Sequence, residues 1–237
     1  MTSTAVATAI GHLRARMTRA AAGAGRDPGA LEIVAVTKGV GVDRIREALA
    51  CGIRSLGENR VQEACLKQEL LGDDVPEWHL IGPLQANKVN KAVGRFTLLH
   101  GIDSTDLVTR IGRRATQLGL TQRLLLQINT ARDPRKAGFA PEEAASAIEM
   151  ARGTEGVSLD GFMALASQDA SEAEVRRTFR ELRELRDHLA PEGSILSMGM
   201  SGDFELAIQE GATHLRIGSG IFGQRPTSQQ EADANHG

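Results

Sequence analysis

The chain has 237 residues, of which 41% are hydrophobic and 24% charged, an ordinary globular composition with enough length for a sizeable core. A net charge of −2 does not indicate the basic surface that binds nucleic acid or a membrane. No apolar run approaches the ~20 residues that span a bilayer. The N-terminal segment lacks the pattern of a signal peptide. Cys51 and Cys65 lack metal-ligand spacing, which indicates reduced structural thiols. We therefore expect a cytoplasmic protein without nucleic-acid or membrane partners, and a monomer, because no strongly apolar surface stripe stands out.

An amphipathic helix is predicted first, over residues 4–22, where apolar residues recur every three or four positions. Strand and helix patterns then alternate. The expected strands cover residues 31–38, 53–56, 77–81, 96–102, 123–129, 158–164, 194–197 and 213–217. The expected helices cover residues 43–50, 61–71, 85–93, 104–118, 141–152 and 203–210. Asp43 is the expected cap of the first of these, and Asp103 or Ser104 the cap of the fourth. A capping box at Ser171 and Glu174 opens a further helix.

Alternating strands and helices imply parallel βαβ units. Eight such units fit an α/β fold of the (β/α)8 type, a single TIM barrel with an extra N-terminal helix, and such barrels run to about 200–250 residues as one domain. A doubly wound open sheet is the alternative. We expect one domain over residues 1–225 and a disordered tail over residues 226–237.

The first predicted strand, LEIVAVTK, is a buried apolar run that ends in Lys38. A lysine at a strand end is most often a solvated charge. It is alternatively a partly desolvated amine that attacks a carbonyl group and forms a Schiff base. The lysine alone does not decide between the two.

Functional residues of a (β/α)8 barrel follow the carboxyl ends of the strands, and phosphate often binds after strands seven and eight. The loops MGMSGD and RIGSG stand there and offer Ser201, Gly218 and Ser219 as an anion cradle. A lysine and a phosphate site at one barrel mouth predict a phosphorylated carbonyl ligand. Pyridoxal phosphate is the leading candidate, and a sugar phosphate bound by a Schiff-base lyase satisfies the same pattern.

Arg216 favours pyridoxal phosphate, because strand alternation turns it toward the same side as Gly218, where it can face the pyridine nitrogen. An arginine does not readily protonate that nitrogen, and an unprotonated ring is a poorer electron sink. A salt bridge to a neighbouring acid is the alternative role for Arg216. Asn59 and His79 are weaker signals: Asn59 can cap a helix, and His79 can be a core residue.

Other patterns are interpreted as structural. Lys136 is expected to be a solvated loop lysine, with contact to an anion as the alternative. Met163, Met198 and Met200 are expected to fill the barrel. The sequence offers no cluster of metal ligands, so we expect no metal site.

Seven ordered segments between residues 31 and 225 resemble the pyridoxal phosphate homeostasis proteins, the YggS/PROSC group. They are AVTK ending at Lys38, GENRVQE from Gly57, WHLIGPLQANK from Trp78, INTARDPRKAG from Ile128, GFMAL from Gly161, SMGMSGD from Ser197 and RIGSGIFGQR from Arg216. That family is similar to the barrel domain of alanine racemase. The departures are mild: Gly39, Asp133 and Ser219-Gly220 replace commoner residues, and none removes a proposed ligand.

The resemblance implies that Lys38 carries pyridoxal phosphate as a Schiff base. Ser201, Gly218 and Ser219 would hold the phosphate, and Arg216 would face the pyridine nitrogen. Two further residues, Asn59 and His79, would line the pocket.

The implied function is pyridoxal phosphate homeostasis by a non-catalytic carrier without catalytic residues, which can pass the cofactor to apo-enzymes. The sequence contains no tyrosine, whereas a racemase of the alanine-racemase type needs one opposite its lysine. The alternatives are a pyridoxal-phosphate-dependent amino-acid racemase or decarboxylase, the sugar-phosphate lyase named above, and an interaction module that binds no small anion.

Overall fold

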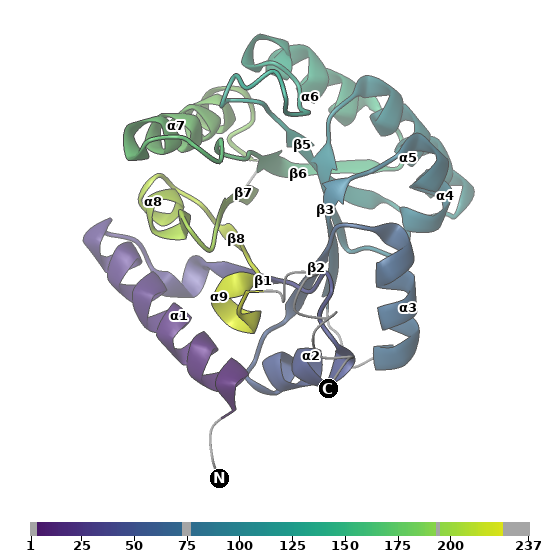
Figure 1. Ribbon diagram of the computed structural model, residues 1–237. Coiled ribbons are helices and arrows are strands. Elements are labelled where there is room, and N and C mark those ends of the chain that lie inside the picture. Colours follow the sequence, from purple (N-terminus) through teal and green to yellow (C-terminus); the bar gives the residue numbers. More distant parts are fainter. Residues whose placement is uncertain (1–3, 73–76, 193–194, 225–237) are drawn as a thin grey trace.

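A closed parallel barrel forms the centre of the computed structural model, which describes residues 4–72, 77–192 and 195–224. In this part of the chain, eight strands follow one another around the barrel in sequence order, and β8 pairs with β1 (Figure 1). The predicted (β/α)8 fold with an extra N-terminal helix is confirmed. The tail expected over residues 226–237 lies outside the described residues.

The strands and helices have the following bounds. The strands are β1 (Glu32–Val36), β2 (Ser55–Glu58), β3 (Glu77–Pro83), β4 (Leu98–Ile102), β5 (Gln122–Gln127), β6 (Val157–Met163), β7 (Ile195–Met200) and β8 (His214–Ile217). The α-helices are α1 (Ala5–Gly23), α2 (Val42–Ala50), α3 (Val61–Leu71), α4 (Val89–Ala92), α5 (Thr105–Gln117), α6 (Ala144–Gly153), α7 (Glu172–Leu189), α8 (Phe204–Gln209) and α9 (Ser219–Phe222). Short 3₁₀ turns are η1 (Pro28–Ala30), η3 (Ala86–Lys88) and η4 (Pro141–Glu143).

Helix α1 lies outside the barrel against α2, α8 and α9 (Figure 1). Thr4 caps its first turn by accepting a hydrogen bond from the Ala7 N–H. Its apolar stripe is buried, as the periodicity predicted: Val6, Ile10, Leu13, Met17. Because α8 and α9 are short, α1 supplies the apolar cover that two full helices would otherwise give the last strands.

The predicted caps are partly confirmed. Ser171 and Glu174 form the capping box at the start of α7, and Ser104 caps α5. The prediction that Asp43 caps α2 is wrong: Gly41 is the cap residue, and Asp43 lies in the first turn. There the Asp43 carboxylate still complements the helix dipole.

Three further elements differ from the prediction. The helix expected over residues 85–93 is two short turns, η3 and α4. β2 ends at Glu58, and β7 continues to Met200, so part of the expected glycine-rich loop is strand. Gly199 has a φ of 92° within β7, a conformation that favours glycine and that a strand-propensity argument does not anticipate.

Most apolar side chains pack between the barrel and its helices, and the barrel interior is partly polar. A small separate apolar cluster fills part of the interior: Leu98, Leu125, Met163, Ile195. Buried polar side chains occupy other interior positions, among them His79, His100, Ser197 and Arg216. None of the described helices combines the length and apolar character needed to cross a bilayer.

Candidate functional site

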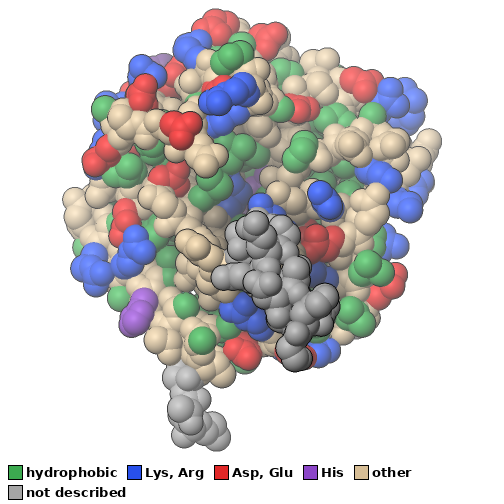
Figure 2. Space-filling view, viewed as in Figure 1, with side chains coloured by type: hydrophobic (Ala, Val, Ile, Leu, Met, Phe, Trp, Pro, Cys, Tyr) green, Lys and Arg blue, Asp and Glu red, His purple; other side chains and the backbone are tan. Residues whose placement is uncertain are grey.

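The barrel mouth at the carboxyl ends of the strands contains two adjoining hollows, which we call the first and second lobes. The first has a volume of about 580 Å³ and lies among the segments after β1, β7 and β8. The second, of about 830 Å³, extends past β2 and β3 to the loop after β6 and to α7. Lys38 and Arg216 line both lobes. Figure 2 shows this face hollowed near its centre, with green hydrophobic side chains around blue Lys or Arg side chains.

Lys38 lies just beyond β1, two residues after Val36. Gly39 has a φ of 69°, in the left-handed region that glycine adopts without strain. The chain therefore turns directly after the lysine. Glycine therefore suits position 39 of this chain.

A buried ion cluster behind the barrel wall fixes both neighbours of Lys38. The Lys67 ammonium on α3 donates to the Thr37 carbonyl oxygen at 2.5 Å, to Glu58 at 2.6 Å and to Glu63 at 2.8 Å. Glu63 also accepts the Gly39 N–H at 2.7 Å. No local sequence pattern indicates this cluster, because its members lie on the segment after β1, at the end of β2 and on α3.

The carboxylates of that cluster have opposite pKa shifts. Burial raises the pKa of Glu58, against hydrogen bonds from Lys67 and Thr37 that lower it. Burial also acts to raise the pKa of Glu63, but hydrogen bonds from Lys67 and the Gly39 N–H outweigh it, and the net shift is downward. Glu58 Oε2 is buried without a hydrogen-bond partner, so Glu58 depends on the Lys67 charge.

The loops after β7 and β8 meet in the first lobe, as the sequence predicted. Ser201, Gly218 and Ser219 all line it. The Gly220 N–H donates to Ser201 Oγ at 3.1 Å, and a Cβ added at Gly220 would lie 2.9 Å from Ile217 Cγ2. The absence of a side chain at Gly220 therefore lets the two loops approach closely.

Arg44 brings a further cation to the first lobe. It extends from α2, donates to the Phe222 carbonyl oxygen at 2.6 Å and lies over the Phe222 ring. With Lys38 and Arg216 it gives the lobe three cationic side chains, which suits an anionic ligand.

Arg216 is buried between the two lobes. Its Nη1 donates to the Ser197 carbonyl oxygen at 2.7 Å and to Ser197 Oγ at 2.6 Å, and its Nη2 donates to the Ala164 carbonyl oxygen at 2.9 Å. Burial lowers its pKa to about 10. The predicted alternative, a direct salt bridge, is not among the ion pairs of the described residues.

Asn59 follows β2 and lines the second lobe. A Cβ at Gly82 would lie 2.5 Å from the Asn59 carbonyl oxygen, so the loop after β2 can pass β3 only because residue 82 is glycine.

His79 lies apart from the other predicted site residues. It lies deeper in the barrel, 1% exposed, and its ring nitrogens contact Glu77 and His100. It is absent from the lining of both lobes, and its burial agrees with the alternative interpretation of His79 as a core residue. Because its position along β3 is closer to the strand's start than to its end, its side chain lies below the mouth.

Two expectations need correction. Lys136 is not a solvated loop lysine, because it lines the second lobe and its ammonium donates to the Leu165 carbonyl oxygen at 3.0 Å. Burial lowers the pKa of Lys136. Met200 is 42% exposed and lines both lobes, whereas Met163 and Met198 are buried as predicted. Met200 differs because β7 carries it up to the mouth.

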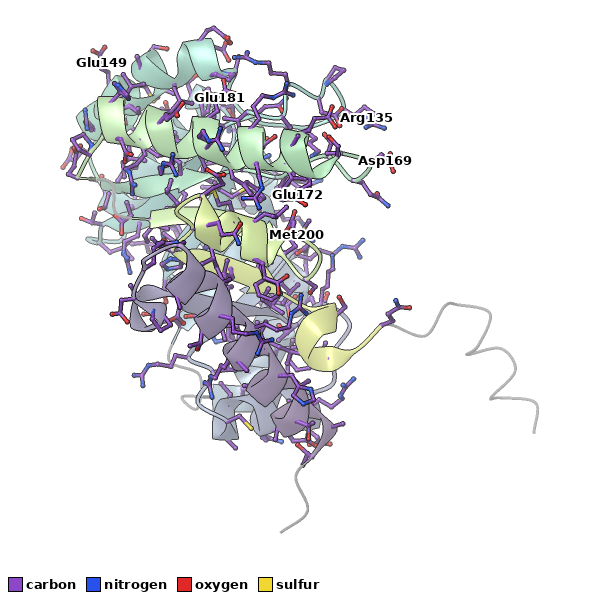
Figure 3. All side chains as sticks on the ribbon, turned by 90° about the vertical axis from the view of Figure 1, so that its left-hand side faces the viewer. Arg135, Glu149, Asp169, Glu172, Glu181 and Met200 are labelled. Carbon is purple, nitrogen blue, oxygen red and sulfur yellow. The ribbon has the colours of Figure 1, made fainter. Side chains whose placement is uncertain are left out.

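The loop that holds Lys136 is fixed by Asp133. Its carboxylate accepts hydrogen bonds from the Arg135 side chain and from Ser167 Oγ, and these hold the pKa of Asp133 well below its usual range. Figure 3 places Arg135 and Asp169 near each other on the same side of the molecule as α9.

Asp203 is another residue that the sequence analysis missed. It lines the second lobe and accepts the Met200 N–H at 2.6 Å, and burial raises its pKa. Within the described residues, no group of three His, Cys, Asp or Glu side chains has the arrangement of a metal site. Cys51 and Cys65 are both free thiols.

This barrel, with a lysine after β1 and small-residue loops after β7 and β8, defines a protein of the alanine racemase barrel class. The family model described as "Alanine racemase, N-terminal domain" matches residues 10–226. An alanine racemase from Clostridium difficile 630 is similar in fold, with a TM-score of 0.70 at 16% identity, over 84% of this chain and 53% of that one.

Closer relatives narrow the class. The pyridoxal phosphate homeostasis protein of Aquifex aeolicus is 40% identical over 214 residues, which cover 89% of this chain and 94% of that protein. The structure of PipY from Synechococcus elongatus PCC7942 with PLP bound is 36% identical, with a TM-score of 0.79 over 92% of this chain and all of that one. The chain belongs to the pyridoxal phosphate homeostasis protein family.

Proposed function

We propose that this protein binds pyridoxal phosphate as a Schiff base on Lys38 and acts as a non-catalytic carrier in vitamin B6 homeostasis in the cytoplasm. In this proposal the protein works as a monomer and passes the cofactor to apo-enzymes, without nucleic-acid or membrane partners. The observation that carries the proposal is the joint lining of the first lobe by Lys38, Arg216 and the small-residue loops.

The residues present fit the cofactor. The first lobe, at about 580 Å³, has the size of a small-molecule site. Ser201 and the loop around Gly218 and Ser219 offer hydroxyl and backbone donors for a phosphate, and Arg44 adds a positive charge. When bound, pyridoxal phosphate supplies an aldehyde that condenses with an amine and a pyridine ring that withdraws electrons.

Each side chain then has a task toward the cofactor. Lys38 provides the amine, in a position fixed through Thr37 and Gly39. Arg216 donates a hydrogen bond toward the pyridine nitrogen. Because arginine does not readily release its proton, the ring stays unprotonated and remains a weak electron sink. This arrangement favours retention of the cofactor over carbanion chemistry.

The sequence contains no tyrosine, so the second base of an alanine-racemase mechanism cannot come from this chain or from a second copy of it. The alternative function is a pyridoxal-phosphate-dependent amino-acid racemase or decarboxylase that uses other residues. The second lobe favours this alternative, because its volume of about 830 Å³ beside Lys38 has room for an amino acid. Turnover of a panel of amino acids, abolished in Lys38→Ala, would establish the alternative.

The direct test is the visible absorbance of the protein after incubation with pyridoxal phosphate, followed by borohydride reduction and peptide mass spectrometry. We expect a Schiff-base band and an adduct on Lys38, both lost in Lys38→Ala. Lys136→Ala is the matched control, because Lys136 lines only the second lobe. An adduct on Lys136 in the wild-type protein, or a band that persists in Lys38→Ala, would overturn the proposal.

A second test concerns the phosphate loops. Ser201→Ala removes a hydroxyl from the first lobe, and the loss of one charge-assisted hydrogen bond is expected to weaken binding by about 1.5–3 kcal/mol. Equilibrium titration with pyridoxal phosphate measures this loss. The same titration with pyridoxal, which lacks the phosphate, should show no difference between Ser201→Ala and the wild type; equal losses for both ligands would place the phosphate elsewhere.

A further inference from the structure

A continuous chain of hydrogen bonds runs through the barrel interior from Arg216 to the start of β3. Ser197 Oγ lies 2.6 Å from Arg216 Nη1 and 2.8 Å from His100 Nδ1. His100 Nε2 lies 3.0 Å from His79 Nδ1, and His79 Nε2 lies 3.0 Å from Glu77 Oε2. All members except Glu77 are buried. The chain thus links the base of the ligand site to a carboxylate at the other end of the barrel.

The two ends of this chain fix the direction of the first and last bonds, and the tautomers of the two rings set the bonds between them. A carboxylate only accepts, so His79 Nε2 carries the hydrogen toward Glu77. If each ring carries a single hydrogen, His79 accepts at Nδ1 from His100 Nε2–H, and His100 accepts at Nδ1 from the Ser197 hydroxyl. Ser197 Oγ in turn accepts from Arg216, which can only donate. In that arrangement all four bonds point from Arg216 to Glu77.

The surroundings keep His100 neutral. Burial lowers its pKa well below the usual value, and the nearby positive charge of Arg216 acts in the same direction. Arg123 and His214 lie near Glu77 and His79, and Ser55 Oγ contacts both Glu77 and Glu32. The hydrogen bond from His79 holds the pKa of Glu77 below its usual value, so Glu77 remains an acceptor near neutral pH.

The chain restricts the orientation of Arg216. The Ser197 carbonyl and hydroxyl oxygens take both hydrogens of Nη1, and the Ala164 carbonyl oxygen takes one of Nη2. Among the described residues these bonds use three of the five guanidinium N–H groups, and the other two remain for a ligand. The contact with His100 holds Ser197 Oγ in place, so the guanidinium plane has a fixed acceptor there.

We propose that Glu77, His79, His100 and Ser197 act as positioning residues that hold Arg216 toward the pyridine nitrogen of pyridoxal phosphate. The inference rests on the proposed function, because it takes pyridoxal phosphate as the ligand of Arg216. To the proposed function, the inference adds a role for His79 and His100, which do not contact the cofactor.

The wild-type protein provides a first test that needs no cofactor. Nitrogen-15 NMR of the histidine rings distinguishes the two neutral tautomers. We expect both His79 and His100 to carry hydrogen at Nε2. A His100 ring protonated at Nδ1, or on both nitrogens at neutral pH, would overturn the inference whatever the protein binds.

The second test uses variants and the cofactor. We expect His100→Phe to weaken pyridoxal phosphate binding by about tenfold and to shift the nitrogen-15 signal of the cofactor's pyridine nitrogen. His214→Phe is the matched control: its ring centroid lies 6.1 Å from that of His79 and 6.5 Å from that of His100, but its hydrogen bond is with Thr213, outside the chain. It should leave affinity and signal unchanged. Equal effects of the two variants would indicate a packing role and overturn the inference.

Glu77 provides a variant pair that does not put the fold at risk, because its side chain is 41% exposed. Glu77→Gln keeps an acceptor oxygen for His79 and should retain most of the affinity and the pyridine signal. Glu77→Leu removes the acceptor and should weaken binding by about threefold. If both variants match the wild type, the chain does not position Arg216. If the wild type itself forms no Schiff-base band, the proposed function fails, while the tautomer measurement still reports on the chain.

Discussion

Replacing Lys67 with methionine is expected to destabilise the fold by about 3–5 kcal/mol, because it leaves the Glu58 carboxylate buried without its partner. Lys67 is 7% exposed and Glu58 is fully buried, so water replaces little of the lost interaction. The Thr37 carbonyl oxygen also loses its donor at 2.5 Å. Methionine keeps most of the side-chain volume, so the loss reports on the charge and not on a cavity.

Urea unfolding followed by circular dichroism measures this loss, with Lys91→Met as the matched control. Lys91 is an exposed lysine of α4, where the same change should alter the free energy of unfolding by less than about 0.5 kcal/mol. The double variant Lys67→Met/Glu58→Gln should be more stable than Lys67→Met alone, because the uncompensated charge is gone. A loss below about 1 kcal/mol in Lys67→Met would refute the reasoning.

The loss should also depend on pH. Burial already raises the pKa of Glu58 in the folded protein, and removing Lys67 raises it further. A carboxyl group with a raised folded-state pKa favours folding below its unfolded-state pKa and loses that contribution as the pH rises through the folded-state value. The difference between Lys67→Met and the wild type should therefore shrink as the pH falls.

The remaining predictions concern two loops. Gly82→Ala should lower the free energy of unfolding by about 1–3 kcal/mol and shift Asn59, because the new Cβ would lie 2.5 Å from the Asn59 carbonyl oxygen. Gly202→Ala is the control, since a Cβ there meets nothing within 4 Å and should leave the thermal midpoint unchanged. Equal midpoints for the two variants would contradict the close approach at Gly82. Asp133→Asn should loosen the loop that Arg135 and Asp133 hold together, with faster limited proteolysis at neutral pH. Because the pKa of Asp133 is lowered in the fold, the contribution of Asp133 to stability is present above the usual aspartate pKa and is lost as the pH falls through the lowered value. The wild type should therefore approach the variant's cleavage rate only at strongly acidic pH.

The barrel was predictable from the sequence because strand and helix patterns alternate eight times, and each pattern follows from local periodicity. Element ends were less predictable. Residues 85–93 have a helical pattern but form two short turns, and β7 extends through Met200 because Gly199 adopts a positive φ. Backbone conformations of single glycines do not show in periodicity.

The candidate site was predictable where a rule of the fold applies. Lys38, Ser201 and Arg216 follow or end strands, so the barrel brings them to one mouth. The depth of His79 was not predictable, because alternation gives the inward direction of a side chain but not its depth along the barrel. Lys67 was missed because a buried ion cluster depends on tertiary contacts that no local pattern encodes.

The pairing of β1 with β8 has a consequence for biosynthesis. Lys38 follows the first strand and Ser219 the last, so the two halves of the first lobe are separated by most of the chain and meet only where the barrel closes. A nascent chain that has not yet released β8 from the ribosome leaves an edge of β1 unpaired and cannot form the lobe. A ligand held between these two strands would bind only the finished barrel, stabilise its last-formed contact and slow amide hydrogen exchange along β1 and β8 more than elsewhere.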